Sequence, residues 1–158
     1  SRRQRQMCIR DRDRDKLIAI CNASVTGQLL AAMAPTLHFE VGQVAKLPIA
    51  NLLPGNWNLK IDNLIQNAKD DWNTQEVSWN FSKPILFVGE QIDSSSGILE
   101  ELVKNVCSYW AMIASEQRQL EIDNNIVVAD AYGVRDDVPC DVPLERVSLK
   151  RNLSLIHI

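Results

Sequence analysis

Carboxylates and one cysteine are the side chains in this sequence whose types and spacing suit catalysis. Asp70 with Asp71, and Asp136 with Asp137, are paired carboxylates of the kind used in general acid and base chemistry. Neighbouring positions of a helix or strand point to different sides, so these pairs are interpreted as solvated turns. Cys140 stands in a proline-rich stretch with no histidine near it in sequence to activate its thiol. The sequence therefore predicts no catalytic residue in this chain.

Metal and cofactor signals are equally missing from the sequence. No Cys or His spacing predicts a metal site, and no glycine-rich stretch predicts a phosphate loop or a cofactor-binding turn. Cys21, Cys107 and Cys140 lie far apart, which argues for a reducing compartment, and we expect a cytoplasmic protein. No apolar run approaches the roughly 18 residues of a membrane span, so no membrane partner is expected.

The element expected to position a binding residue is the stretch of residues 34–49, APTLHFEVGQVAKLPI. Apolar residues alternate with polar ones from Leu37 to Val41, which is the period of a half-buried strand. Gly42 then permits a bend before a second short apolar run, residues 44–49, in which Pro48 favours an edge strand. A helix should precede this unit, with Ser24 as its N-cap.

Helical spacing dominates the rest of the chain. Apolar residues fit a short amphipathic helix over residues 59–69 and a helix of roughly 25 residues that starts near Ser96. Residues 123–125, Asp-Asn-Asn, predict a break, after which a second helix ends at Gly133, a natural left-handed cap residue. We therefore expect a helical hairpin, followed by a short edge strand over residues 144–149.

Between these helices lies an aromatic segment, residues 70–87, that is otherwise rich in polar and turn-favouring residues. Trp72, Trp79 and Phe81 suggest a strap that anchors itself to a larger body by aromatic plugs. Stacking of these rings on nucleic-acid bases is the sharper alternative. Only Lys69 and Lys83 supply basic charge nearby, so packing is the preferred interpretation.

Both ends of the chain look like translated adapter DNA. The last six residues, LSLIHI, back-translate as CTG TCT CTT ATA CAC ATC, and Met7 to Asp11 back-translates as the opposite strand of the same transposon-end duplex. We exclude residues 1–12, expected to be disordered, and residues 153–158 from fold reasoning. The alternative is a natural basic N-terminal arm that binds nucleic acid.

Without these ends the chain is acidic. Residues 13–152 hold 12 Lys and Arg against 19 Asp and Glu, a formal charge of −7, compared with −3 for the whole sequence. A main DNA-binding surface normally carries an excess of basic residues. This stretch is therefore not expected to be the principal DNA-gripping part of a protein, and it reads as a piece cut from a longer one.

Together these elements predict an α+β fold that is mainly helical, with a helix and short β unit followed by a long helical hairpin. The expected organisation is a unit of helix and short strands over residues 13–50, then a helix and aromatic strap over 51–93. The helical hairpin follows over 94–133, and a tail with a short strand over 134–152.

Three motifs resemble one family, in the family's order. Residues 23–49, ASVTGQLLAAMAPTLHFEVGQVAKLPI, resemble the end of the target-recognition region of adenine-specific DNA methyltransferases of the BREX phage-defence system, the PglX family, which is related to fused restriction and modification enzymes. Residues 68–81, AKDDWNTQEVSWNF, and residues 121–149, EIDNNIVVADAYGVRDDVPCDVPLERVSL, are similar to two later motifs of that family. The departures are Ala34 for Asn, Gln43 for Asp and Val134 for Leu, which affect details of turns.

The resemblance implies a parent enzyme that transfers a methyl group from S-adenosylmethionine to the amino group of an adenine rotated out of double-stranded DNA. Neither the family's Asn-Pro-Pro-Tyr motif nor its cofactor turn occurs here. The chain would be a non-catalytic C-terminal part that closes the recognition region. Lys46 is the basic residue expected nearest the DNA, and His38 is the second choice. Other defence-system proteins are possible partners of the parent.

Two alternatives remain open on the sequence. A specificity subunit of a type I restriction system would recognise DNA without chemistry, but it should carry a second unit like residues 24–49, and none is seen. An acidic helical interaction domain would instead dock on a protein partner through the apolar stripe of residues 99–113.

Overall fold

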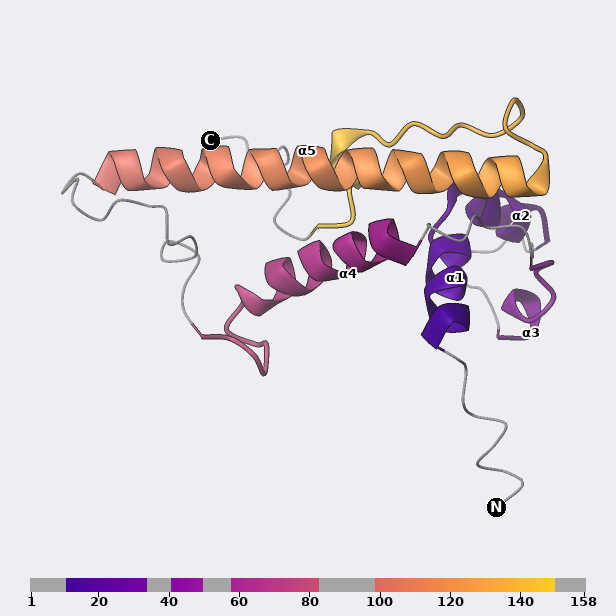
Figure 1. The fold of residues 1–158 in the computed structure, drawn as a ribbon, viewed down its shortest axis with the longest axis horizontal. Helices are drawn as coiled ribbons and strands as arrows, with labels where there is room; N and C mark the ends of the chain where they lie inside the picture. Colours follow the sequence, from indigo (N-terminus) through magenta and orange to yellow (C-terminus); the bar gives the residue numbers. More distant parts are fainter. Residues whose placement is uncertain (1–10, 34–40, 50–57, 83–98, 150–158) are drawn as a thin grey trace, which may run out of the picture. The chain divides into compact units, whose positions relative to one another are not determined.

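All regular structure in the described part of the chain is helical (Figure 1). The computed structural model describes residues 11–33, 41–49, 58–82 and 99–149. Its elements are α1 (Asp11–Cys21), α2 (Ser24–Met33), α3 (Val41–Val44), α4 (Asn58–Asn73), α5 (Leu99–Tyr132) and the 3-10 helix η3 (Leu144–Arg146). The chain divides into two compact units, residues 1–62 with 121–141 and residues 63–120 with 142–158, and α4 and α5 contribute to both.

The predicted α+β fold is wrong, because no residue in the described ranges lies in a strand. The first expected strand, residues 37–41, lies almost entirely outside those ranges. The second, residues 44–49, is instead the end of α3 and a turn, in which the N–H groups of Ala45 and Leu47 donate to the carbonyl oxygens of Val41 and Val44 at 3.0 and 3.1 Å. These local bonds occupy the groups that a strand would offer to a neighbour, and two short strands without a third are marginal in any case.

The predicted helical hairpin is also wrong, because α5 runs without a break for 34 residues. Asn and Asp weaken helices when their side chains compete for nearby backbone groups. In this helix the amides of Asn124 and Asn125 are buried and bond to backbone groups of residues distant in sequence. Three of their four side-chain polar atoms are bonded within the unit, all except Asn124 Oδ1, so these side chains do not compete for the backbone of α5 and the expected break does not form.

The end of α5 and the segment after it follow local backbone rules. Gly133 has φ of 69° and terminates α5, with the N–H of Gly133 donating to Asp130 and that of Val134 to Ala129, both at 3.0 Å, as in a Schellman motif. The left-handed cap predicted at Gly133 is therefore confirmed. The edge strand expected over residues 144–149 is wrong, because this stretch begins with η3, in which Arg146 N–H donates to Pro143 at 2.9 Å.

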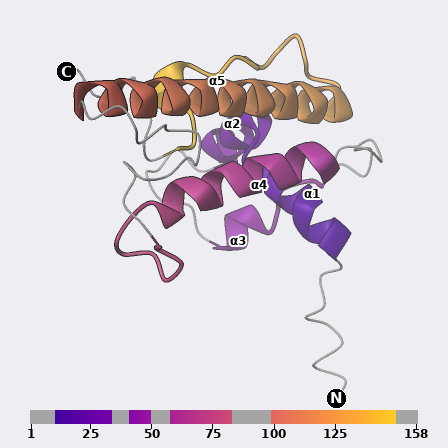
Figure 2. The same cartoon turned by 60° about the vertical axis from the view of Figure 1, so that its left-hand side comes forward.

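The first unit is organised around the corner between α1 and α2, where the two helix axes bend by 69°. The helix predicted from Ser24 to Met33 is confirmed as α2, which lies against α5 in both views (Figures 1 and 2). The core of this unit combines apolar side chains with a few buried polar ones, among them Thr26, Asn124 and Asn125. Its buried apolar residues are Ala19, Ile20, Ala23, Val25, Leu47, Ile61, Val128 and Ala129.

The second unit packs the C-terminal part of α4, the turns that follow it and the N-terminal part of α5. The helix predicted over residues 59–69 is confirmed as α4, and it continues for another turn to Asn73. Val106, Trp110 and Ala114 recur every four residues along α5 and are buried. A polar pair joins the two helices, since the Asn67 amide donates to Gln117 Oε1 at 3.2 Å.

A membrane-spanning helix is not found in the described ranges. Only α1 and α2 taken together have enough length and apolar character, and they are separated by the 69° bend.

Candidate functional site

Two adjacent amides of α5 hold the corner between α1 and α2. Asn124 Nδ2 donates to the carbonyl oxygen of Ala19 at 2.9 Å, near the end of α1. Asn125 Oδ1 accepts from the N–H of Ser24, the first residue of α2, also at 2.9 Å. Asn125 Nδ2 donates to the carbonyl oxygen of Cys140 at 3.1 Å. Because helix ends leave such backbone groups unpaired, these bonds both satisfy the ends and fix the corner.

At the start of α2, the bond from Ser24 N–H to Asn125 stands where a local side-chain cap was expected. Ala23, not Ser24, holds the N-cap position, since its carbonyl oxygen accepts from Gly27 N–H at 3.3 Å. The Ser24 hydroxyl oxygen is buried and makes no hydrogen bond in the described part of the chain. Thr26 strengthens the corner by donating from Oγ1 to Ile20 at 2.6 Å. The N-cap prediction for Ser24 is therefore wrong, because Ser24 is the first residue of α2 and its own N–H donates to Asn125, while the N–H groups of Thr26 and Gly27 donate to the Ala23 carbonyl oxygen.

Lys46, the predicted DNA-contacting residue, lies on an exposed turn after α3. Its backbone N–H donates to Gln43 at 3.0 Å, and the next residue, Leu47, is buried. The phenol of Tyr132, the last residue of α5, donates to the carbonyl oxygen of Pro48. The turn is thus attached to the unit directly after Lys46, while the lysine side chain remains in solvent.

The charge around Lys46 is sparse. Its ammonium group has no ion-pair partner among the described residues. Two other cations of the unit are already paired, Lys60 with Asp123 at 2.5 Å and Arg135 with Asp130 at 2.8 Å. A single free ammonium can contact one phosphate group but does not form a basic groove. His38, the second predicted contact residue, lies outside the described residues.

The sequence-predicted carboxylate pairs do not form a catalytic site. The solvated turn expected at Asp70 and Asp71 is wrong, because both residues lie in α4 and Asp71 is 4% exposed. Asp70 beside it is exposed, so the two side chains face different environments, as their spacing predicts. Asp136 and Asp137 are both exposed in the turn after α5. The Cys140 thiol donates to the carbonyl oxygen of Val138 at 3.6 Å. Within the described ranges, no three side chains of His, Cys, Asp or Glu gather as metal ligands would.

The described residues also do not fit the binding of S-adenosylmethionine. Such a site needs a glycine turn at which the backbone can approach the cofactor closely. Gly27 and Gly42 lie within α2 and α3, and Gly133 caps α5. No cofactor chemistry is therefore assigned to these residues.

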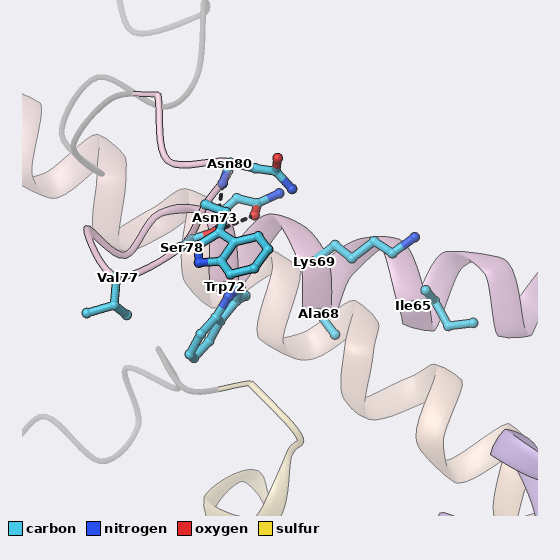
Figure 3. A pocket seen from close by; sticks show the side chains of 9 residues that line it. Ile65, Ala68, Lys69, Trp72, Asn73, Val77, Ser78 and Asn80 are labelled. Atoms are coloured by element: carbon cyan, nitrogen blue, oxygen red, sulfur yellow. Dashed lines mark hydrogen bonds between the residues drawn. The ribbon is translucent and has the colours of Figure 1, made fainter.

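The aromatic segment forms a shallow hollow at the end of α4 (Figure 3). The hollow has a volume of about 700 Å³, and its lining includes Trp72, Val77 and Trp79. The side chains of Trp72 and Trp79 are 49% and 100% exposed. Trp72 and Trp79 are therefore not plugged into a larger body among the described residues, while Phe81 is half-buried. Among the segment's described residues, the buried ones are instead polar, namely Asp71, Thr74, Gln75 and Ser78.

Sequence reasoning missed Asn124 and Asn125 as positioning residues and interpreted them as a helix break. The available signal was their place within an otherwise apolar stripe, between Leu120 and Val128. Polar residues at buried helix positions commonly mark a hydrogen bond to another element.

Comparison with known proteins gives two relatives. The chain is 26% identical over 145 residues to the adenine-specific methyltransferase PglX of Lacticaseibacillus casei (strain Zhang), a match that covers 86% of the chain and 12% of that protein. It is 23% identical over 123 residues to the adenine-specific methyltransferase BrxX of Escherichia coli O9:H4 (strain HS), covering 75% of the chain and 9% of that protein. No family model and no solved structure matches the chain.

These matches confirm the resemblance found in the three motifs: over most of its own length, the chain is similar to a short segment of the adenine-specific methyltransferases PglX and BrxX.

Proposed function

We propose that this chain is a non-catalytic, C-terminal part of a site-specific adenine DNA methyltransferase. The parent enzyme would transfer a methyl group from S-adenosylmethionine to adenine in double-stranded DNA, in the cytoplasm, as part of a BREX or restriction-modification defence against phage. The similarity of 86% of the chain to only 12% of an adenine-specific methyltransferase carries this proposal. The remainder of the longer polypeptide would supply the cofactor site and the contacts to other defence proteins.

Within that enzyme, the first unit would close the target-recognition region and bring Lys46 near the DNA backbone. Two observations support this role. The Lys46 ammonium group is exposed and unpaired among the described residues, and Tyr132 attaches the turn beside it to α5. The acidic character of residues 13–152 limits the contribution to a local contact, since most of the binding energy for phosphates comes from many cations together.

Recovery of the upstream coding sequence from the source DNA tests the proposal. We expect the reading frame to continue upstream into an Asn-Pro-Pro-Tyr motif. The full-length protein should methylate adenine in plasmid DNA, and a version without residues 14–149 should bind S-adenosylmethionine but lose methylation. A free-standing gene that starts near Lys16, or a full-length protein that leaves adenine unmodified, would rule the proposal out.

A further inference from the structure

Three large apolar side chains form an exposed edge at the end of α4 and on the turns that follow it. Trp72 is 49% exposed, Val77 is 69% exposed and Trp79 is fully exposed. We call these three residues the tryptophan edge. They line one hollow, and Figure 3 shows Trp72 and Val77 beside it on the α4 end and the following turn. Single exposed apolar residues are common on protein surfaces, but a cluster with two tryptophans marks a site of contact.

The backbone that carries the tryptophan edge is held by many local hydrogen bonds. Ser78 N–H donates to Gln75 at 2.9 Å, and Phe81 N–H donates to Ser78 at 3.1 Å. Ser78 Oγ donates to Asn73 Oδ1 at 2.8 Å and accepts from Asn80 N–H at 3.2 Å. With Ser78 buried, its neighbour Trp79 is held outward on an ordered turn. An aromatic side chain placed in this way loses little conformational entropy when a partner covers it.

We infer that the tryptophan edge docks against another part of the same longer polypeptide. This inference rests on the proposed function, in which the chain is one piece of a larger enzyme. The segment matched in the two relatives is 12% and 9% of their length, so most of such a polypeptide lies outside this chain and is available as the occupant. The occupant and the tryptophan edge thus belong to one covalent chain. This link raises the effective concentration of the two surfaces, which favours their contact even when the buried area is modest.

The charges beside the edge define the chemistry of the occupant. Asp70 and Glu76 are exposed and lie within two residues of Trp72 and Val77 in sequence, and Lys69 is the one cation among the described residues that line the hollow. Two carboxylates against one ammonium group leave a small negative charge, which disfavours nucleic-acid phosphates and the same surface of a second copy. The complementary surface is therefore an apolar depression for the Trp79 ring, with a hydrogen-bond acceptor for its indole N–H and basic side chains opposite Asp70 and Glu76.

Oxidative footprinting of tryptophan tests the inference directly. The 158-residue chain and the full-length protein recovered from the source DNA are each exposed to hydroxyl radicals, and oxidation of Trp79 is measured by mass spectrometry. We expect Trp79 to react at least about tenfold more slowly in the full-length protein without DNA, because a docked ring is shielded from the reagent. Met112, 58% exposed on α5, serves as an internal control that should react at a similar rate in both.

Each other outcome overturns the inference. Protection of Trp79 only after DNA is added would identify nucleic acid as the occupant. If protection of Trp79 in the 158-residue chain increased with protein concentration, the occupant would be a second copy of the chain. Rapid oxidation under all conditions would show that nothing covers the edge. Because adenine methylation is measured separately, protection without methylation would refute the proposed function alone, and methylation without protection would refute the docking alone.

A pair of variants gives a second, independent measurement. Trp79→Gln should lower the melting temperature of the full-length protein and leave that of the 158-residue chain unchanged, since the ring is fully exposed in the latter. Met112→Gln, a matched exposed substitution, should change neither. Equal effects of Trp79→Gln on both proteins would show that the ring acts only within its own turn, and the docking inference would then be wrong.

Discussion

Asn125 Oδ1 accepts a hydrogen bond from the backbone N–H of Ser24 at 2.9 Å, across a separation of 101 residues in sequence. The same amide donates to Cys140, so one side chain of α5 joins the start of α2 to the segment beyond the helix. This arrangement couples the long helix to the corner that leads toward Lys46. The stability of the first unit should therefore depend on Asn125, a polar residue at which the sequence pattern predicted a helix break.

Asn125→Ala should destabilise the 158-residue chain by about 2 kcal/mol, because it leaves the Ser24 N–H and the Cys140 carbonyl oxygen without their partner in a partly buried site. Urea unfolding followed by circular dichroism measures the change. Asn22→Ala is the matched control, since the Asn22 amide, in the turn after α1, donates to Ile18 four residues earlier and is exposed. Its effect should stay within about 0.5 kcal/mol. Equal losses in the two variants would contradict a special role for Asn125.

Two glycines should respond in opposite directions to the same substitution. Gly133→Ala should cost about 1 kcal/mol, because φ of 69° disfavours a residue with a Cβ atom. Gly27→Ala should instead stabilise by about 0.5 to 1 kcal/mol, because Gly27 lies inside α2 with ordinary helical geometry. No atom lies within 4 Å of the added Cβ at either position, so steric contact does not enter. Urea midpoints that moved in the same direction would contradict this assignment of backbone conformations.

The helices of this chain could be predicted from sequence wherever an apolar stripe and a local end signal agree. The α2 and α4 helices and the Gly133 cap follow from spacing and from the conformational freedom of glycine. Residues 123–125 could not be assigned, because Asn favours either a break or a buried bond depending on partners about 100 residues away. Sequence patterns of period 3.6 or 2 carry no information about such partners.

The strands predicted over residues 44–49 and 144–149 failed for a related reason. A short apolar run forms a strand only if another strand accepts its backbone bonds, and the N–H groups of Ala45, Lys46 and Leu47 bond locally instead. Prediction of the candidate site from local sequence is limited in the same way. The sequence could single out Lys46 as a rare cation of its region, but its exposure depends on the burial of Leu47 and on the bond from Tyr132 to Pro48.

Tyr132→Phe should loosen the turn that carries Lys46. The variant loses the hydrogen bond to Pro48, worth about 0.5 to 1.5 kcal/mol, while the ring remains. We expect faster hydrogen exchange of the Lys46 and Leu47 backbone amides, which bond within this turn to Gln43 and Val44.

Tyr109→Phe is the matched control for that experiment, because Tyr109 is 39% exposed on α5 and its contact is between rings, with Trp110 at 5.6 Å. Its exchange rates in residues 45–47 should equal those of the unmodified chain. Unchanged exchange in Tyr132→Phe would mean that α3 and Leu47 hold the turn without help from α5.

Lys46→Ala in the full-length protein should weaken DNA binding by the contribution of one phosphate contact. The expected sign is a lower affinity at low salt and a reduction of the slope of log K against log salt by about 1, since one fewer counterion is released. Arg146→Ala removes the same charge from an exposed position outside this turn and should leave both quantities unchanged. Fluorescence anisotropy with a labelled duplex at several salt concentrations measures both. If Lys46→Ala behaves like Arg146→Ala, the lysine does not face DNA, and the turn held by Tyr132 serves only the packing of the first unit.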